Sequence, residues 1–163
     1  MMTEKERDIF DGRLKVEKIR NGTVIDHITS GRSRLVRSIL NLDWYESVVI
    51  YAANLKSKKA EVLKDVVKIE DHFLTPEEVA KLAVLSPNAT INTVKEYQLV
   101  DKQVIQMPDE IKDILICPNA NCITRFEEVA SWFNVQSKEP LTLRCRYCER
   151  IFRGSEVIDN NGN

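Results

Sequence analysis

The spacing of apolar side chains in the first third of the chain has the period of strands and then that of a helix. Residues 14–19 alternate apolar and polar positions, as a half-buried strand does, and Asn21 and Gly22 form a strong turn signal before residues 23–28. We therefore predict a strand that runs through a turn. The apolar positions after Ser33 recur about every 3.6 residues, which predicts a helix with Ser33 as its cap.

Three later segments have the length and composition of strands. Residues 48–55 form an apolar run that is typical of a central, buried strand. Residues 62–69 are rich in β-branched side chains, and residues 90–100 return to the alternation of a strand. A helix is expected between these last two segments. Thr75 is a favourable N-cap, and Pro76 suits the first helical position.

The predicted order of elements is β-α-β-β-α-β, with the second helix ending before the Ser-Pro pair at position 86. Proline restricts the residue before it, which resists the α region. This order is the split βαβ plan of an α+β domain, in which two helices pack on one face of an antiparallel sheet. We assign it to residues 13–105, with residues 101–108 leading into a second unit. Residues 1–12 are charged and aperiodic, and we expect them to be flexible.

All the cysteines of the chain lie in its last third, as a C-x4-C pair and a C-x2-C pair separated by 22 residues: Cys117, Cys122, Cys145 and Cys148. Two close pairs of thiolates suit a tetrahedral Zn²⁺ site. Two disulfides and a redox dithiol are the alternatives. The first pair has the wrong spacing for a redox dithiol, and the charged N-terminus does not resemble a secretory signal. Zinc is therefore the favoured interpretation.

A structural role for zinc follows from the size of the second unit, residues 106–163. A core below roughly 70–80 residues needs a staple, and a closed four-sulfur site leaves no position for water or substrate. The turns within both cysteine pairs are expected to point backbone N–H groups at sulfur. Residues 111–116 and 141–145 have the pattern of strands, so we predict a small β-rich unit resembling a zinc ribbon.

Composition narrows the function classes. The formal net charge is −1 and the basic residues are scattered, whereas a nucleic-acid binder is expected to show a basic footprint. No apolar run approaches the roughly 20 residues that span a bilayer. Cysteines kept for metal binding suggest a cytoplasmic location. We therefore expect neither nucleic acid nor a membrane as a partner.

The residues of the second unit also raise two other function classes. Five residues around the second cysteine pair motivate a nucleic-acid-binding zinc ribbon: Arg144, Arg146, Tyr147, Arg150 and Arg153. Acidic residues in the same unit disfavour it. An enzyme is disfavoured because the metal site is closed and both histidines of the chain lie in the other unit.

The motifs of this chain resemble those of a known family, the regulatory chains of aspartate carbamoyltransferase. Five motifs stand in the family's order over nearly the whole chain: GTVIDHI from Gly22, VKIE from Val67, ATIN from Ala89, CPNANCI from Cys117 and CRYCE from Cys145. The resemblance implies a nucleotide-binding allosteric domain of ferredoxin-like form and a zinc domain, with one ion per chain, that docks on catalytic chains. It also implies no catalysis, a regulatory-chain homodimer, and a dodecamer of two catalytic trimers and three regulatory dimers.

The resemblance further implies that ATP, CTP and UTP are the effectors. An effector acts by its differential affinity for a low-activity and a high-activity state. Lys68 and Lys102 are expected to contact ribose and phosphate, where a triphosphate needs cations, and Asp26 and His27 are expected near the base, ribose and phosphates. The positions implied to line the base and sugar pocket are Glu17, Ile19, Val24, Asn92, Val94, Tyr97 and Leu99. Arg13 is implied as a further nucleotide-binding position, one that can be lysine in relatives. Backbone groups of Ile19 and Tyr97 are expected to read the base edge.

The residues alone also permit interpretations in which these side chains have no role in ligand binding. Lysines such as Lys68 and Lys102 are most often solvated surface residues. Asp26 and His27 would also fit a hydrogen-bonded strand end.

Overall fold

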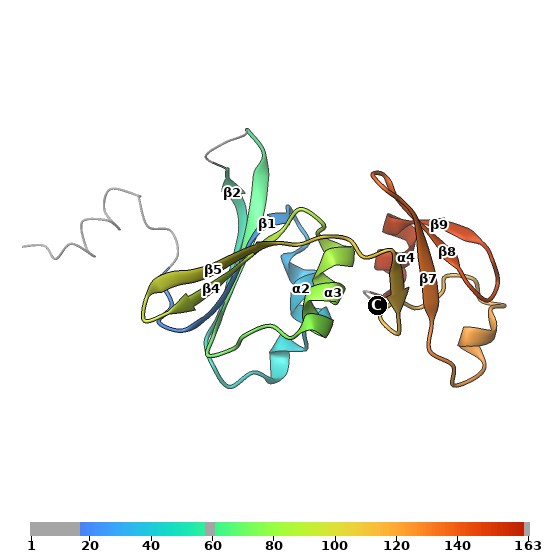
Figure 1. Cartoon of the computed structure of the whole chain (residues 1–163), viewed down its shortest axis with the longest axis horizontal. Coiled ribbons are helices and arrows are strands. Elements are labelled where there is room, and N and C mark those ends of the chain that lie inside the picture. The colour runs from blue at the N-terminus through green and yellow to red at the C-terminus, as the bar shows by residue number, and fades with distance from the viewer. Residues whose placement is uncertain (1–16, 58–60, 162–163) are drawn as a thin grey trace, which may run out of the picture.

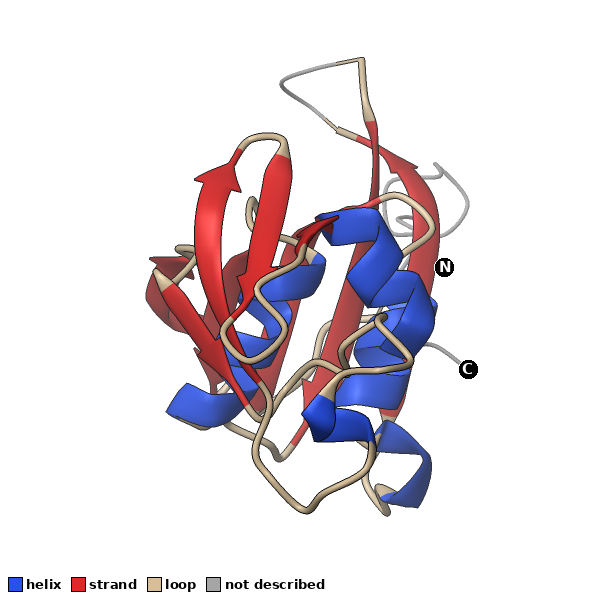
Figure 2. Ribbon diagram, turned by 90° about the vertical axis from the view of Figure 1, so that its right-hand side faces the viewer, coloured by secondary structure: helices blue, strands red, loops and turns tan. Residues whose placement is uncertain are grey.

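The structure is a computed structural model that describes residues 17–57 and 61–161. Its first unit is a five-stranded antiparallel sheet in the order β2-β3-β1-β4-β5, with both helices on one face (Figures 1 and 2). The elements are β1 (Gly22–Thr29), α2 (Ser33–Ile39), the 3-10 turn η1 (Leu42–Trp44), β2 (Val49–Lys56), β3 (Leu63–Glu70), α3 (Pro76–Leu85), β4 (Thr90–Lys95) and β5 (Gln98–Val104). The α+β prediction and the β-α-β-β-α-β order are confirmed, and β5 is an added edge strand.

The core of this unit lies between the sheet and the two helices. Ile25 of β1, Val67 and Ile69 of β3 and Leu82 of α3 are fully buried. Burying each such side chain contributes about 1.5–3 kcal/mol. Successive side chains of a strand point to opposite faces, so the residues between them, such as Val24 and Lys68, lie on the face that the helices leave uncovered. That face points away from the second unit (Figure 1).

The predicted strand at residues 14–19 is wrong in the part that the structure describes. Residues 17–19 have no strand pairing, residues 14–16 lie outside the described residues, and β1 begins only at Gly22. The preceding segment is held instead by the β4–β5 turn, where the Tyr97 N–H donates to the Arg20 carbonyl at 2.9 Å. Gly22 has φ +136°, and a Cβ there would lie 2.1 Å from the Ile69 carbonyl oxygen. Glycine therefore permits the close pairing of β1 with β3.

The apolar run at residues 48–55 is an edge strand, and the prediction of a central strand is wrong. Among the residues that the structure describes, β2 pairs with β3 alone, at one end of the sheet. Val48 and Tyr51 remain exposed beside it, and Trp44 of the nearby η1 turn is 88% exposed. An apolar run indicates that the side chains on both faces of a strand are buried. It does not indicate whether they are buried by this chain or by another chain.

Residues 90–100 form a hairpin rather than one strand. β4 and β5 are joined by Glu96 and Tyr97, which both have positive φ, at 48° and 64°. Two-residue hairpin turns favour such backbone angles, but they usually carry Asn or Gly. The turn was missed because neither residue is a typical turn former.

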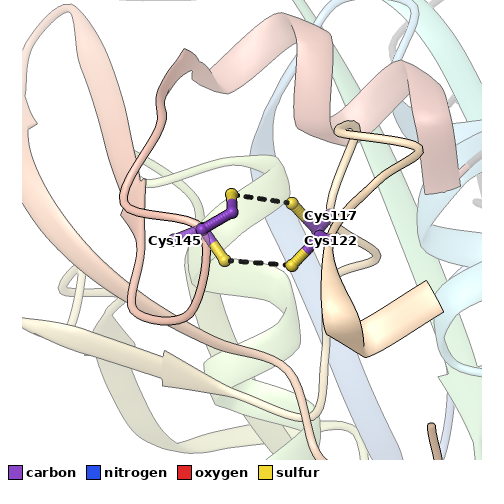
Figure 3. Close-up of side chains that lie close together, drawn as sticks. Cys117, Cys122 and Cys145 are labelled. Carbon is purple, nitrogen blue, oxygen red and sulfur yellow. Dashed lines mark hydrogen bonds between the residues drawn. The ribbon is translucent and has the colours of Figure 1, made fainter. Parts of the chain in front are cut away.

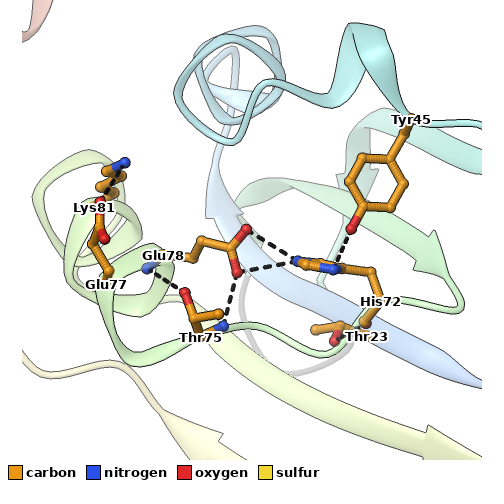
Figure 4. Close-up of polar contacts among 7 residues, drawn as sticks. All are labelled: Thr23, Tyr45, His72, Thr75, Glu77, Glu78 and Lys81. Carbon is orange, nitrogen blue, oxygen red and sulfur yellow. Dashed lines mark hydrogen bonds and ion pairs between the residues drawn. The ribbon is translucent and has the colours of Figure 1, made fainter.

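The cap of α3 is confirmed. The Thr75 side chain accepts from the Glu78 N–H, and the Glu78 carboxylate accepts from the Thr75 N–H, which completes a capping box (Figure 4). The same carboxylate lies 3.0 Å from His72 Nε2, and the Tyr45 hydroxyl meets the other ring nitrogen of His72. This network joins the η1 segment, the β3–α3 loop and α3.

The predicted cap of α2 is wrong, because Ser33 makes no capping bond with its side chain. The cap is supplied instead by Asp65, a fully buried residue of the neighbouring strand β3. Its carboxylate accepts from the backbone N–H groups of Gly31 at 3.0 Å, Ser33 at 3.2 Å and Asn54 at 3.0 Å. A carboxylate from another strand thus satisfies the turn that begins α2.

We expect Asp65→Asn to lower the free energy of unfolding by about 1–3 kcal/mol at neutral pH, because an amide loses the charge and part of the accepting capacity. Burial works to raise the pKa of Asp65, but the bonds from Asn54, Ser33 and Gly31 hold it below its ordinary value of 3.8. The contribution is therefore present above the unfolded-state pKa and is lost as the pH falls through the folded-state pKa. Urea unfolding of both proteins should show the difference shrinking in acid, whereas the exposed Asp43→Asn control should change little.

The second unit is a four-stranded sheet, in the order β6-β7-β8-β9, with one terminal helix. Its elements are β6 (Glu110–Lys112), the 3-10 turn η2 (Ile123–Arg125), β7 (Trp132–Lys138), β8 (Leu141–Cys145), β9 (Ile151–Arg153) and α4 (Gly154–Asn161). The strand predicted at 141–145 is confirmed, and the one at 111–116 is shorter than predicted. Phe133, Leu143 and Val157 form a fully buried core. In the described part of the chain, no helix has the length and apolar character to cross a bilayer.

Candidate metal centre and ligand-binding face

The fold brings the four cysteine sulfurs together. Cys117 and Cys122 flank the turn before η2, Cys145 ends β8, and Cys148 lies in the turn before β9. Their sulfur atoms all lie within 4.8 Å of one another, and the first three residues are buried. Figure 3 shows sulfurs of the two pairs facing each other across the centre. The cluster therefore joins the loop before β7 to the end of β8.

The distances suit a metal ion and do not suit disulfides. Cys117 Sγ lies 3.8 Å from Cys148 Sγ, and Cys122 Sγ lies 3.8 Å from Cys145 Sγ. A disulfide requires about 2.05 Å. Around a tetrahedral ion with metal–sulfur bonds of about 2.3 Å, neighbouring sulfurs lie about 3.8 Å apart. The donor set therefore fits a closed tetrahedral site with four protein ligands.

Hydrogen bonds around the sulfurs favour thiolates, as the turn sequences predicted. Backbone N–H groups of Asn119, Thr124, Tyr147 and Cys148 donate to cysteine sulfurs. Burial raises the pKa of the Cys117 and Cys145 thiols. Burial works the same way on Cys122, but the Thr124 hydroxyl at 3.2 Å and the Thr124 N–H lower its pKa to about 7. A bound cation removes the remaining protons, so binding is coupled to proton release.

Four of the predicted nucleotide residues form one row across the uncovered face of the five-stranded sheet. In the strand register, Lys68 of β3 pairs with Val24 of β1, Val24 pairs with Asn92 of β4, and Asn92 pairs with Lys102 of β5. Paired residues on one face are direct neighbours. The Asn92 amide also donates to the Val24 carbonyl at 3.3 Å. Two ammonium groups thus flank an apolar and an amide side chain.

Asp26 and His27 follow Val24, the β1 residue of this row, along the same strand. The Asp26 carboxylate pairs with Lys64 Nζ at 2.7 Å and accepts from the His27 N–H at 2.6 Å. Partial burial works to raise the pKa of Asp26, but these two partners hold it below its ordinary value. His27 has φ 57°, in the irregular part of β1, and its side chain is 44% exposed.

Sequence reasoning missed Lys64. It precedes Lys68 by four residues on β3, and the period of a strand places both side chains on the same face. That spacing is visible in the sequence once residues 63–70 are taken as a strand. The uncovered face therefore holds a third lysine, already paired with Asp26.

The segment before β1 closes one edge of this face. Lys68 Nζ donates to the Glu17 carbonyl at 2.6 Å, and Ile19 is buried. Burial lowers the pKa of Lys68, partly offset by Asp26. The bond to Arg20 occupies the Tyr97 N–H, one of the two backbone positions expected to read a base. Arg13 lies outside the described residues.

Val94 and Leu99 lie next to the row rather than in it. They pair with each other at the β4–β5 turn, and Val94 also pairs with Gly22. Val94 is partly buried and Leu99 is 58% exposed, so Leu99 is not a core residue. Both border the same end of the uncovered face as Tyr97.

The arginines of the second unit are partly neutralised. Arg144 lies 3.3 Å from Glu149, and Arg146 lies 3.9 Å from Glu110 while stacking on the Trp132 ring. A continuous basic stripe of the kind that binds nucleic acid is not formed by these residues.

Comparison with known proteins gives matches over both units. The model of the aspartate carbamoyltransferase regulatory chain, allosteric domain, matches residues 14–106, and that of the metal binding domain of the same chain matches residues 109–158. A regulatory chain from Thermococcus gammatolerans is 48% identical over 148 residues, which is 90% of this chain and 97% of the relative. One from Pyrococcus furiosus is 47% identical over 149 residues, which is 90% of this chain and 97% of that relative.

The similarity extends to Methanothermobacter thermautotrophicus, whose aspartate carbamoyltransferase regulatory chain is 48% identical over 145 residues, covering 88% of this chain and 92% of the relative. The matched regions include the uncovered face of the sheet and all four cysteines. The protein therefore belongs to the aspartate carbamoyltransferase regulatory chain family, as a non-catalytic chain with an allosteric domain and a four-cysteine metal-binding domain.

Proposed function

We propose that this chain binds nucleotide effectors on the uncovered face of its five-stranded sheet and holds catalytic chains through a zinc-stabilised second domain. ATP, CTP and UTP are the proposed effectors. The observation that carries the proposal is the row from Lys68 through Val24 and Asn92 to Lys102 on the face opposite the helices. Nucleotide binding would then control pyrimidine synthesis by favouring one quaternary state of the assembly.

The chemistry of this face suits a nucleoside triphosphate. Lys68 and Lys102 supply compact charges for phosphate, and Lys64 holds Asp26 in place near them. The apolar side chains of Val24 and Val94 offer a surface for a base, next to the Asn92 amide. His27, beside Asp26 at the rim of this face, would donate a ring N–H to phosphate.

Zinc is the proposed metal. Four thiolates in a closed tetrahedral arrangement, with backbone N–H donors to the sulfurs, are the donor set of a structural zinc site. One Zn²⁺ per chain would be held by all four cysteines. The reducing conditions of the cytoplasm, where we place the assembly, keep such thiols available for metal.

The surface proposed to dock on catalytic chains is an apolar patch beside the metal centre. All four of its apolar side chains are exposed, and they lie before, within and just after the η2 turn that Cys122 anchors: Ile116, Ile123, Phe126 and Val129. Exposed apolar groups gathered in this way mark interaction sites. The metal fixes the loop that carries them, so metal binding and docking are linked.

We expect Phe126→Ser to weaken binding to catalytic trimers by at least tenfold, because the side chain is 74% exposed in the free chain and suits an aromatic anchor. Zinc content and the free energy of unfolding should stay unchanged. Val104→Ser, an exposed apolar residue of the allosteric domain, is the matched control. Surface-plasmon measurements on immobilised trimers test this, and equal affinity of the Phe126 variant and the unaltered chain would remove this patch from the interface.

A regulatory-chain homodimer is proposed through the exposed edge of the sheet at β2. Trp44, Val48 and Tyr51 are exposed beside this edge, which no other described strand pairs with and which offers backbone groups to a second copy. Three such dimers would bridge two catalytic trimers into the proposed dodecamer.

The test of the whole function is the response of catalytic chains to nucleotide. Purified catalytic trimers are assayed for carbamoyl-aspartate formation with and without this chain, at subsaturating aspartate, with ATP, CTP or UTP added. The proposal predicts that nucleotide changes the rate only when this chain is present. Rates insensitive to nucleotide in a verified complex would contradict it.

A further inference from the structure

A cavity of about 520 Å³ lies where the two domains meet, and neither the metal centre nor the nucleotide face uses it. One wall comes from the ends of β1 and α3 and from the turn before α2, and the other comes from the β7–β8 turn and the start of α4. Figure 1 shows α3 and α4 facing each other at this boundary. The volume lies within the roughly 300–1,000 Å³ of small-molecule sites.

Most of the cavity wall is apolar. Val84, Leu85 and Pro87 line it from the allosteric domain, and Leu141 and Ile158 line it from the metal-binding domain. The second wall is tightly packed, since a Cβ on Gly154 would lie 2.7 Å from a side-chain carbon of Leu141. The start of α4 therefore packs closely against Leu141, at the end of the β7–β8 turn, and this packing fixes the second wall of the cavity.

The polar groups of the cavity are cationic or hydroxyl-bearing. Arg32 and Arg153 line it together with the hydroxyls of Thr29, Thr142 and Ser155, and no lining residue is acidic. Arg32 Nη1 is buried and has no hydrogen-bond partner among the described residues. Asp65, which caps the same turn, is already engaged by the backbone N–H groups of Gly31 and Ser33. A buried guanidinium donor without an acceptor is unfavourable, because it has lost its hydrogen bonds to water and gained none in exchange.

We propose that this cavity binds a small amphipathic carboxylate, with the carboxylate on the Arg32 guanidinium and an apolar body against Leu85, Leu141 and Ile158. The guanidinium fork matches the geometry of a carboxylate and would regain the missing acceptor. The apolar wall supplies the burial that a bare inorganic anion would not use.

Such a ligand touches both domains, so its binding free energy depends on how they are placed relative to each other. Binding of the ligand favours the relative placement of the domains in which both cavity walls contact the ligand. If nucleotide or catalytic chains change that placement, they change the affinity for the carboxylate. By linkage, the carboxylate then changes the affinity for nucleotide or for catalytic chains by the same factor. The cavity is thus a second ligand site, distinct from the nucleotide face.

Isothermal titration of the full, zinc-loaded chain with octanoate tests the proposal. We expect saturable binding of one octanoate per chain. Arg32→Gln should weaken it at least tenfold, and Arg32→Lys should recover part of the loss because it restores charge without the fork. Arg37→Gln, an exposed arginine of α2 outside the cavity lining, is the matched control and should bind as the unaltered chain does.

Two comparison ligands separate the contributions. 1-Octanol, which lacks the charge, and inorganic phosphate, which lacks the apolar body, should both bind at least tenfold more weakly than octanoate. Lys68→Ala should leave octanoate binding unchanged, so that failure of the nucleotide site and failure of this site are told apart. The absence of octanoate binding, or equal binding to a folded Arg32→Gln variant, would overturn the proposal.

Discussion

Replacing Cys145 by Ser should remove the metal from this chain and unfold its second domain while the first stays folded. Cys145 is fully buried at the end of β8, and its sulfur lies 3.8 Å from that of Cys122. A hydroxyl is a poor substitute for a thiolate ligand, and structural zinc contributes about 10–16 kcal/mol of apparent binding free energy in small zinc peptides. The small core around Phe133 does not replace a contribution of that size.

The expected readouts for Cys145→Ser are independent of each other. Metal analysis should fall from one zinc per chain to near zero, and amide NMR signals of residues 109–158 should collapse while those of the five-stranded sheet persist. Nucleotide affinity should change less than about threefold. Thr142→Ser, on the same strand, should retain zinc and is the control. Stoichiometric zinc with native NMR signals in the Cys145 variant would show that the four-sulfur site is wrong.

Lys68→Ala should have the opposite effect, with at least a tenfold loss of nucleotide affinity and no loss of zinc. The ammonium group lies at one end of the row that runs to Lys102, where it donates to the Glu17 carbonyl. Burial lowers the pKa of Lys68, so the free protein holds this charge in a partly desolvated place. Bound phosphate would supply the counter-charge, and removing the lysine should therefore weaken binding more than it weakens the fold.

Titration calorimetry with CTP and ATP measures this effect. The control is Lys138→Ala, an exposed lysine of the metal-binding domain whose partner is Asp109. It removes the same charge from the chain without touching the uncovered face. Equal affinities of the Lys68 variant, the Lys138 variant and the unaltered chain would move the nucleotide site elsewhere.

The sequence alone was sufficient to predict features that depend on residues close together along the chain. Four cysteines in two close pairs predicted a cluster that the fold does assemble, and Thr75 with Pro76 predicted the start of α3 to the residue. Both signals are local, since the spacing or the cap lies within a few residues. The β-α-β-β-α-β order followed from periodicity together with β-branched composition and the turn and cap signals.

The features that sequence reasoning missed depend on contacts between distant segments. Asp65 caps α2 from more than thirty positions away along the chain, and no local pattern marks it. β2 has the apolar composition of a central strand although it lies at the end of the sheet, and only the pairing with β3 reveals this position. Lys64 joins the uncovered face only once the register of β3 is known, and Arg32 becomes notable only because two domains enclose it.

The most direct test of the account is the mass of this chain mixed with aspartate carbamoyltransferase catalytic trimers, measured by light scattering after gel filtration. The measurement is made with Zn²⁺ and again after thiol modification and chelation. The account predicts a species with the mass of two trimers and three regulatory dimers in zinc, and separate trimers once the metal is removed. Failure of verified trimers to form any complex with the zinc-loaded chain, or a complex that survives metal removal, would contradict it.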